Sequence, residues 1–515
     1  MKRNRTTNTV KNTISGVFNK IVSILMPFLT RTVIIYILGM EYAGLNGLFS
    51  SILQVLNLAE LGISTAVVWC MYKPMAIQDT DLLCALLKYI RRLYYIIGCI
   101  IAVVGIALIP FLPYLISGDV PSDLNITVMY GIYLLYTVIG YFFYSYKSTL
   151  LNAGQNVGII SNINSGIIFL QSLTQILVVV IFKSYYGYLI LMPIFTLINN
   201  VWISYAVKKL YPDITCRNEL SVETKKDISA HIKGLFVTRI CNTTRNALDS
   251  IFISAFLGLT TVAIYGNYYY IMYAVTGVLN AITTAMTASV GNSLVTENVE
   301  KNYHDMRKFN FLFNWIVGFC TCCLLTMYQP FVQVWVGKEG LFPFNMVFIF
   351  CLYFYFLNIG SIRAVYHDAA GLWWEARYRA ILEAVANLIL NFVLTSTLGA
   401  FGTVLGTLIS LVFINYMYGA QIVFKYYFKG ISVKEYFKDN GKYGLVTLVA
   451  CFIVFFIINR FDNTGWIGVI IGLITSLLIF NIIYFLFFCR TKLFKESLST
   501  MRSIISNIRN KKCLH

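Results

Sequence analysis

Charge is scarce in this sequence. Only 12% of its 515 residues are Asp, Glu, Lys or Arg, which is about half the share found in soluble domains. Hydrophobic residues make up 58% of the chain, and the mean hydropathy is +0.71. This composition excludes a soluble globular fold and is typical of an α-helical protein that crosses a membrane many times.

Metal-ligating side chains are also few or dispersed. The four histidines do not cluster in the sequence, and the twelve cysteines are scattered, several of them within apolar runs. The one CxxC match, Cys320 to Cys323, lies inside an apolar run and has no second pair. Such cysteines are interpreted as small buried side chains. We therefore expect no metal site and no cofactor.

Long apolar runs account for most of the chain. Runs of about 20 residues are long enough to cross a bilayer as a helix, and the run that starts near Ile14 is too long for a cleavable signal peptide. The sequence predicts fourteen spans, at 14–38, 43–71, 93–116, 124–146, 158–182, 185–207, 234–258, 262–290, 310–335, 341–366, 378–398, 401–424, 443–459 and 465–489.

The positive charges predict the orientation of these spans. With the N-terminus placed in the cytoplasm, 32 of the 40 Lys and Arg residues fall on cytoplasmic segments and only three on outside loops, namely Lys183, Lys338 and Arg460. This asymmetry follows the positive-inside rule, so both termini are expected in the cytoplasm. The net charge of +18 is then explained by orientation and by anionic membrane lipids, and nucleic acid is not expected as a partner.

An internal repeat appears when the sequence is shifted by 219 residues. Leu38-Gly39 then falls on Leu257-Gly258, Gly47 on Gly266, and Lys20 on Arg239. Because six predicted spans separate the two copies, both copies start on the same side of the membrane. Parallel repeats of this kind occur in transporters, with the substrate site between the halves.

These observations predict an all-α polytopic membrane protein of about fourteen spans. Two six-helix lobes in a parallel, pseudo-two-fold repeat are followed by two C-terminal helices. The predicted domains are an N-terminal lobe at 1–229 with a cytoplasmic linker, a C-terminal lobe at 230–430, and 431–515 with helices 13 and 14. The last segment ends in a basic amphipathic helix, predicted to lie on the inner leaflet, with apolar residues at Phe494, Leu498, Met501, Ile505 and Ile508.

Several predicted spans carry charged residues. Each charge at bilayer depth costs roughly 2.5–3.5 kcal/mol on insertion scales, so such residues are functional candidates by default. The cations in the spans are Lys20, Arg31, Arg239, Arg245 and Arg363. Candidate acids are Glu60 and Asp249, and Arg245 and Glu60 both lie roughly 17 Å from the inner end of their helices. The excess of cations predicts a cavity that prefers an anion.

Polar residues at helical spacing predict the lining of that cavity, with Asn46 and Asn57 on the second span and Asn280 and Thr284 on the eighth. A purely structural role is an alternative for each of these residues. Lys20 and Arg363 lie close enough to a helix end to extend into the interface. Arg245 and Asp249 can form a purely structural i, i+4 pair, and Glu60 and the Asn and Thr residues can serve helix packing.

Four segments carry a family resemblance. The chain resembles Wzx-type polysaccharide flippases of the multidrug/oligosaccharidyl-lipid/polysaccharide (MOP) exporter superfamily, on the segments LGMEYAGLNGLF (Leu38–Phe49), LAELGIS (Leu58–Ser64), LDSIFISAFLGLTTVAIYGNY (Leu248–Tyr268) and LGAFGTVLGTLIS (Leu398–Ser410). The resemblance implies two six-helix lobes around a cavity that opens alternately to each side of the membrane. The implied substrate is an undecaprenyl-pyrophosphate-linked oligosaccharide, flipped outward across the bacterial inner membrane.

The resemblance and the buried charges together give a site hypothesis. Arg31, Arg239 and Arg245, with Lys20 and Arg363, are expected to hold the pyrophosphate, because guanidinium groups suit phosphate oxygens. Glu60 and Asp249 are expected to balance those charges or to carry a coupling ion, H⁺ or Na⁺. We expect a monomer that is not an enzyme, with a polysaccharide polymerase as a further candidate partner.

Three alternatives stay open. A multidrug cation antiporter of the same superfamily would have an acid-dominated cavity, and a lipid II flippase would be needed for growth. A membrane glycosyltransferase or polymerase is less compatible with the repeat and with outside loops of at most about ten residues, because lipid-linked sugar chemistry outside the cell usually needs a larger external loop. The aromatic segment Tyr265–Tyr273 is a candidate surface for stacking on sugars, although aromatic residues at membrane interfaces are the commoner case.

Overall fold

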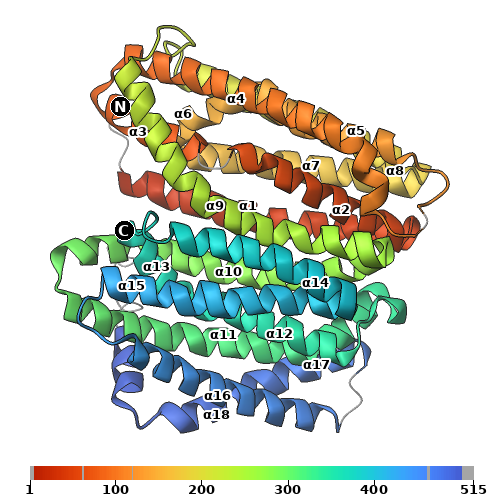
Figure 1. The fold of residues 1–515 in the computed structure, drawn as a ribbon, viewed down its shortest axis with the longest axis vertical. Coiled ribbons are helices and arrows are strands. Elements are labelled where there is room, and N and C mark those ends of the chain that lie inside the picture. Colours follow the sequence, from red (N-terminus) through yellow and green to blue (C-terminus); the bar gives the residue numbers. More distant parts are fainter. Residues whose placement is uncertain (1–4, 61–62, 119, 461–463, 502–515) are drawn as a thin grey trace. The chain divides into compact units, whose positions relative to one another are not determined.

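The computed structural model describes the backbone of residues 5–60, 63–118, 120–460 and 464–501. Within these ranges the side chains of residues 5–14, 59, 227, 230–246 and 288 lie outside the description. The described residues form helices, with no strand among them (Figure 1). The predicted all-α class is therefore confirmed.

The chain divides into two compact units, Met1–Gly266 and Asn267–His515. These units are defined by internal contacts, so the predicted lobes at 1–229 and 230–430 remain a prediction about the repeat. The first unit contains α1 (Arg5–Ile37), α2 (Met40–Leu56), η1 (Asn57–Glu60), α3 (Ile63–Ile77), α4 (Thr80–Leu108), η2 (Ile109–Leu115), α5 (Ile126–Phe142), η3 (Ser145–Lys147), α6 (Ser148–Ala153), α7 (Val157–Phe182), α8 (Tyr185–Leu210) and α9 (Val222–Leu257).

One helix, α10 (Leu259–Thr296), starts in the first unit and continues into the second. The other elements of the second unit are α11 (Val299–Val336), η4 (Lys338–Gly340), α12 (Phe344–Ile359), α13 (Ser361–Ala369), α14 (Arg377–Ser410), the π-helix η5 (Leu411–Tyr418), α15 (Gly419–Tyr426), α16 (Val433–Ile458), α17 (Gly465–Thr475), the π-helix η6 (Ser476–Phe480) and α18 (Asn481–Phe488).

Every predicted span overlaps one or more of these helices. Within the described ranges, ten helices are long and apolar enough to cross a membrane, or eleven when the bent pair Ile126–Phe142 and Ser145–Ala153 counts as one span. The count of fourteen stays a prediction. Part of the difference lies in one 50-residue helical segment, Arg377–Tyr426, which covers two predicted spans. At about 1.5 Å per residue it far exceeds a bilayer core of about 30 Å, and Gly399 breaks it with a φ of 62°.

The second predicted span, 43–71, is interrupted. The helix α2 ends at Leu56, the 3₁₀ helix η1 follows, and α3 begins at Ile63. The predicted polar residues Asn57 and Glu60 are the first and last residues of η1 itself. A tighter 3₁₀ turn changes which face each side chain presents, so the polar stripe predicted along one straight helix does not continue as one.

Two glycines at the repeated LG pairs share a backbone geometry. Gly39 joins α1 to α2 with a φ of 124°, and Gly258 joins α9 to α10 with a φ of 85°. Positive φ is accessible to glycine without steric cost. The 219-residue shift therefore aligns two helix junctions of the same kind, which agrees with the predicted repeat.

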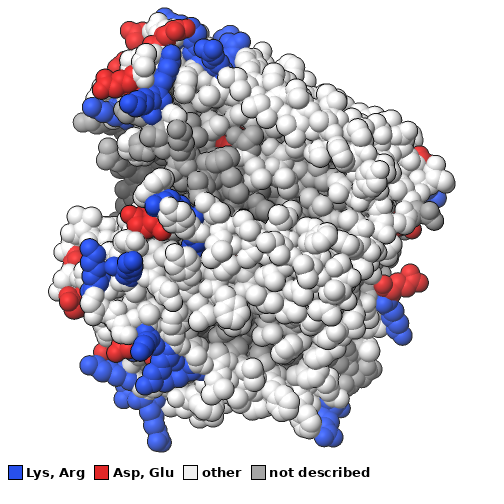
Figure 2. Space-filling model, viewed as in Figure 1, with Lys and Arg blue, Asp and Glu red and all other residues white. Residues whose placement is uncertain are grey.

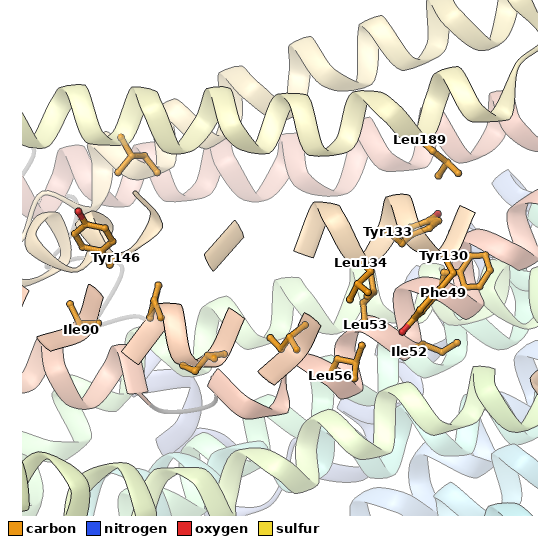
Figure 3. Packing of buried hydrophobic residues seen from close by; sticks show 14 of the residues in the cluster. Phe49, Ile52, Leu53, Leu56, Ile90, Tyr130, Tyr133, Leu134, Tyr146 and Leu189 are labelled. Carbon is orange, nitrogen blue, oxygen red and sulfur yellow. The ribbon is translucent and has the colours of Figure 1, made fainter. Parts of the chain in front are cut away.

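The core of the first unit forms where α2, α5 and α8 meet. Figure 3 shows Phe49, Ile52 and Leu53 beside Tyr130 and Tyr133. The Phe49 ring lies 5.9 Å from the Tyr130 ring and 5.4 Å from the Tyr133 ring. Aromatic pairs at this spacing add to the energy of burial. This packing holds α2, which carries the predicted polar residue Asn46, against α5.

The long sides of the helices are apolar on their exposed faces. On α7, for example, the exposed residues Phe169, Leu173, Leu177 and Val180 follow helical spacing. In Figure 2 most charged side chains of each unit gather near helix ends, and the surface along the helices is white. Apolar sides with charged ends are the surface of a membrane protein. The protein is therefore a multi-pass membrane protein.

The C-terminal helix at residues 492–501 docks on the second unit. Phe494 is buried against Phe311 and Trp315 of α11, and Ser497 Oγ donates to the carbonyl of Lys308 at 3.5 Å. The first residue of the predicted amphipathic stripe thus packs on protein and not on lipid. Ile505 and Ile508 lie outside the described residues.

Candidate functional site

Arg31 binds the start of α10. This half-buried residue lies near the end of α1, and its Nη2 donates to the carbonyl of Ala263 at 2.9 Å. A Cβ on Gly266 would lie 2.8 Å from the same nitrogen, so the guanidinium group occupies the space that this glycine leaves. A charged donor to a backbone carbonyl makes a stronger hydrogen bond than a neutral one.

Asp249 binds the same part of α10. Its side chain is 1% exposed, and its Oδ2 accepts a hydrogen bond from the Tyr265 hydroxyl at 2.7 Å. A buried carboxylate requires donors, because desolvation disfavours its charge. The structure thus brings the predicted residues Arg31 and Asp249 onto one short stretch of helix, at Ala263 and Tyr265.

Asn46 is the centre of a tyrosine cluster. Its side-chain nitrogen donates to the Tyr188 hydroxyl at 3.2 Å, and its Oδ1 accepts from the Tyr133 hydroxyl at 2.8 Å. Tyr133 and Tyr185 place their hydroxyl oxygens 3.4 Å apart. All three tyrosines are buried. Sequence reasoning found Asn46 but missed these tyrosines, because their contacts join α2 to α5 and α8, and no local pattern reports such contacts.

Asn57 and Glu60 lie on η1 and contact two further tyrosines. The Tyr141 hydroxyl donates to Asn57 Oδ1 at 3.0 Å, and the Tyr94 hydroxyl donates to Glu60 Oε1 at 3.4 Å. Glu60 is half-buried. Tyrosine hydroxyls therefore surround the predicted polar residues of this unit along both α2 and η1.

Tyr42 lies in the first turn of α2, at the end of this helix that is predicted to face the outside of the cell. It holds the segment between η2 and α5 in place. Its hydroxyl donates to Asp123 Oδ1 at 2.7 Å, and the Tyr186 hydroxyl accepts from the backbone nitrogen of Asn125 at 2.7 Å. Burial, together with the Asp123 carboxylate, raises the pKa of Tyr42 to about 12. The phenol therefore stays protonated and able to donate throughout the physiological pH range.

Arg363 lies in the second unit, in a separate polar network. It is 6% exposed, and its Nη1 donates to the carbonyl of Asn415 at 2.9 Å. Asn415 Nδ2 donates to Glu383, and Arg379 Nη1 contacts Glu383 Oε2 at 2.8 Å. Arg363 is thus buried among protein groups. Sequence reasoning missed Asn415, because a π-helix such as η5 has no reliable sequence pattern.

The remaining predicted residues are placed as follows. Lys20 is half-buried on α1, and Asn280 and Thr284 are exposed on α10. The side chains of Arg239 and Arg245 lie outside the described part of α9. Of the predicted aromatic segment, Tyr265 and Tyr268 are buried, while Tyr273 is 50% exposed.

An apolar cavity of about 710 Å³ lies within the second unit. Its walls come from α10, α11, α13, α18 and the C-terminal helix, and they include Met286, Phe313, Trp315, Leu498 and Met501. Among residues whose side chains are described, no group of three or more His, Cys, Asp or Glu could hold a metal ion. The candidate residues thus lie in polar networks within each unit, and the apolar cavity belongs to the second unit.

Comparison with known proteins identifies solved structures with a similar fold. No family model matches the sequence, and no curated protein is significantly similar to it. A solved structure of the lipid II flippase MurJ, in an inward closed conformation, matches with a TM-score of 0.69 over 93% of this chain and 99% of that chain, at 16% identity.

Two transporter structures match less extensively. An inward-facing multidrug resistance MATE family transporter of the MOP superfamily has a TM-score of 0.57 and 16% identity, over 78% of this chain and 97% of that chain. A mutant of the MATE transporter VcmN of Vibrio cholerae has a TM-score of 0.54 and 14% identity, over 82% and 99%. This chain therefore shares the fold of these MurJ and MATE structures. These three solved structures are of a flippase and of two transporters.

Proposed function

We propose that this protein is a flippase that moves undecaprenyl-pyrophosphate-linked oligosaccharides across the bacterial inner membrane for surface polysaccharide synthesis. It works by alternating access, with both termini in the cytoplasm. The supporting observation is the fold match to MurJ, a flippase for another lipid-linked sugar, over 93% of the chain at a TM-score of 0.69. The MATE matches have lower TM-scores, 0.57 and 0.54, over less of the chain.

The proposed cargo has three chemical parts, and the chain offers a matching feature for each. Lys20, Arg31, Arg239, Arg245 and Arg363 are the proposed cationic groups for the pyrophosphate. Half-exposed aromatic rings such as Tyr273 could face the sugars. The apolar cavity of about 710 Å³ offers space for part of the prenyl chain.

Glu60 and Asp249 are the proposed charge-balancing or ion-coupling residues. Glu60 is half-buried and accepts from Tyr94, and Asp249 is buried and accepts from Tyr265. Carboxylates in spans of transporters commonly take part in proton or ion pathways. The coupling ion is therefore proposed to be H⁺ or Na⁺.

Deletion of the gene tests the cargo. Undecaprenyl-pyrophosphate-linked oligosaccharide should accumulate on the inner leaflet, and surface polysaccharide should be lost. Accumulation of lipid II with arrest of growth would instead identify a lipid II flippase. Unchanged glycans with increased sensitivity to cationic drugs would identify a multidrug antiporter.

Substitution of Arg245 tests the proposed site. Arg245→Ala should abolish polysaccharide export in the complemented deletion strain, at an unchanged level of membrane protein. Arg460→Ala is the matched control, because Arg460 is an exposed cation outside the predicted spans. Normal export by Arg245→Ala would contradict the site assignment while leaving the cargo assignment to the deletion experiment.

A further inference from the structure

The helix α10 belongs to both compact units. Its residues up to Gly266 group with the first unit, and those from Asn267 onward group with the second. The helix itself runs without a break from Leu259 to Thr296. Any movement of one unit relative to the other must therefore be absorbed by this helix near Gly266 or by its contacts on one side of that point.

The contacts on the first side come from three different helices. Arg31 of α1 donates to the carbonyl of Ala263 at 2.9 Å, and Asp249 of α9 accepts from the Tyr265 hydroxyl at 2.7 Å. The third contact is with α2. A Cβ on Gly44 would overlap the backbone carbonyl of Leu259, so this glycine allows the two backbones to approach closely.

The Arg31 contact also acts on the helix backbone itself. In an α-helix the carbonyl of Ala263 accepts from the backbone nitrogen of Asn267, four residues later. This hydrogen bond crosses the boundary between the units. A charged donor on the same carbonyl offers that oxygen a second partner. Side chains that hydrogen-bond to the backbone of a helix are a known cause of kinks. If α10 bends here and the hydrogen bond from Asn267 breaks, the Ala263 carbonyl still accepts from Arg31.

We propose that Arg31, Asp249 and the glycine face of α2 fix residues 259–266 to the first unit, and that α10 bends directly after Gly266 during transport. Arg31 and Asp249 are then positioning residues for this movement. The inference rests on the proposed alternating-access function, but it does not depend on which cargo is carried.

A disulfide between α2 and α10 tests whether this stretch stays fixed. A Cβ on Gly47 would lie 3.3 Å from Val262 Cγ1, which is within reach of disulfide geometry. In Gly47→Cys/Val262→Cys, copper phenanthroline should cross-link most molecules in intact cells. Polysaccharide export should stay within twofold of the two single-cysteine variants, before and after reduction.

Two outcomes would overturn the proposal. One is a complete cross-link that stops export until it is reduced, because the two helices would then have to separate during the cycle. The other is a cross-link that fails to form although the variant exports normally, because the two helices would then not stay in contact.

Spin-label distances locate the bend without any cargo. In a background whose twelve native cysteines are replaced, one label is placed at the exposed Leu177 of α7. The second is placed either at the exposed Thr260, before the proposed bend, or at Tyr273, after it. In nanodiscs the Leu177–Thr260 distances should be narrow and the Leu177–Tyr273 distances broad or two-peaked.

The Arg31→Ala variant completes the test. It should broaden the Leu177–Thr260 distribution towards that of Leu177–Tyr273, whereas an arginine that only binds cargo would leave the width unchanged, because no cargo is present. Equal widths for Thr260 and Tyr273 in the parent protein would show that the bend is elsewhere and overturn the proposal. Because no cargo is present, this result is independent of the deletion experiment that tests the proposed function.

Discussion

The Asn415 side chain donates to both carboxylate oxygens of Glu383, at 3.0 and 2.9 Å. Arg379 completes the surroundings of this carboxylate from one helical turn away, at 2.8 Å. Arg363 donates to the backbone carbonyl of the same Asn415. Asn415, from the π-helix η5, therefore links the buried charges of Glu383 and Arg363.

This network predicts a large effect of removing the acid. Glu383→Ala leaves Arg379, whose side chain is only 12% exposed, without its carboxylate, and breaking a buried pair costs about 3–5 kcal/mol. The apparent melting temperature in detergent should fall by several degrees, with a smaller fall for Glu383→Gln, which keeps hydrogen-bonding groups. The exposed Glu339 provides the control, and Glu339→Gln should leave the melting temperature unchanged. An equal effect at both positions would argue against the network.

The close approach of α2 to α10 predicts a second effect. Gly44→Ala places a Cβ against the backbone carbonyl of Leu259, which cannot move as a side chain can. Overpacking of this kind costs about 1–3 kcal/mol. Gly131→Ala is the control, because a Cβ there meets no atom within 4 Å. The melting temperature should fall for Gly44→Ala only, and equal stability of the two variants would contradict the close packing.

The positions of the helices could be predicted from the sequence, because an apolar run of about 20 residues must be helical in a bilayer. Their breaks could not. The sequence predicts one straight span over 43–71, whereas the structure has a 3₁₀ turn at Asn57–Glu60. It predicts two spans between 378 and 424 but not the π-helix that follows α14. Such breaks involve contacts between distant segments, those of Asn57 and Glu60 with Tyr141 and Tyr94 at η1 and that of Asn415 with Arg363 at η5.

The sequence predicts the charged residues of the candidate site but not the groups to which they bind. Arg31 and Asp249 could be found because charges are rare in apolar runs. Their partners, the Ala263 carbonyl and the Tyr265 hydroxyl, could not, because one is a backbone atom and the other is one of 36 tyrosines. A tyrosine beside a buried acid has no sequence signal that separates it from a tyrosine in the core.

The buried pair of Asp249 and Tyr265 predicts energetic coupling. Tyr265→Phe removes a donor from a carboxylate that is 1% exposed, and leaving a buried acceptor short of a partner costs about 1–3 kcal/mol. Asp249→Asn should also destabilise. The double variant should lose less stability than the sum of the two single losses, measured by thermal unfolding in detergent. Simple additivity would show that the hydroxyl and the carboxylate do not interact.

The docked C-terminal helix predicts the behaviour of Phe494. This side chain is 6% exposed and packs on Phe311 and Trp315. Phe494→Ala removes a buried ring, which typically costs about 3–5 kcal/mol. The variant should therefore melt at a lower temperature in detergent, and proteinase K, which does not require Lys or Arg, should cleave its tail faster in inside-out vesicles. Lys495→Ala is the control on the exposed face of the same helix.

Measurements in detergent and in vesicles distinguish whether the C-terminal helix is held by packing on the protein or by adsorption to lipid. If protein packing holds it, Phe494→Ala lowers the melting temperature in detergent, where no bilayer is present. If adsorption to anionic lipid holds it, the variant melts like the parent protein in detergent, and Lys495→Ala has the larger effect on proteinase K cleavage in vesicles because it removes a charge near the headgroups. The contacts of Phe494 with α11 favour the first result.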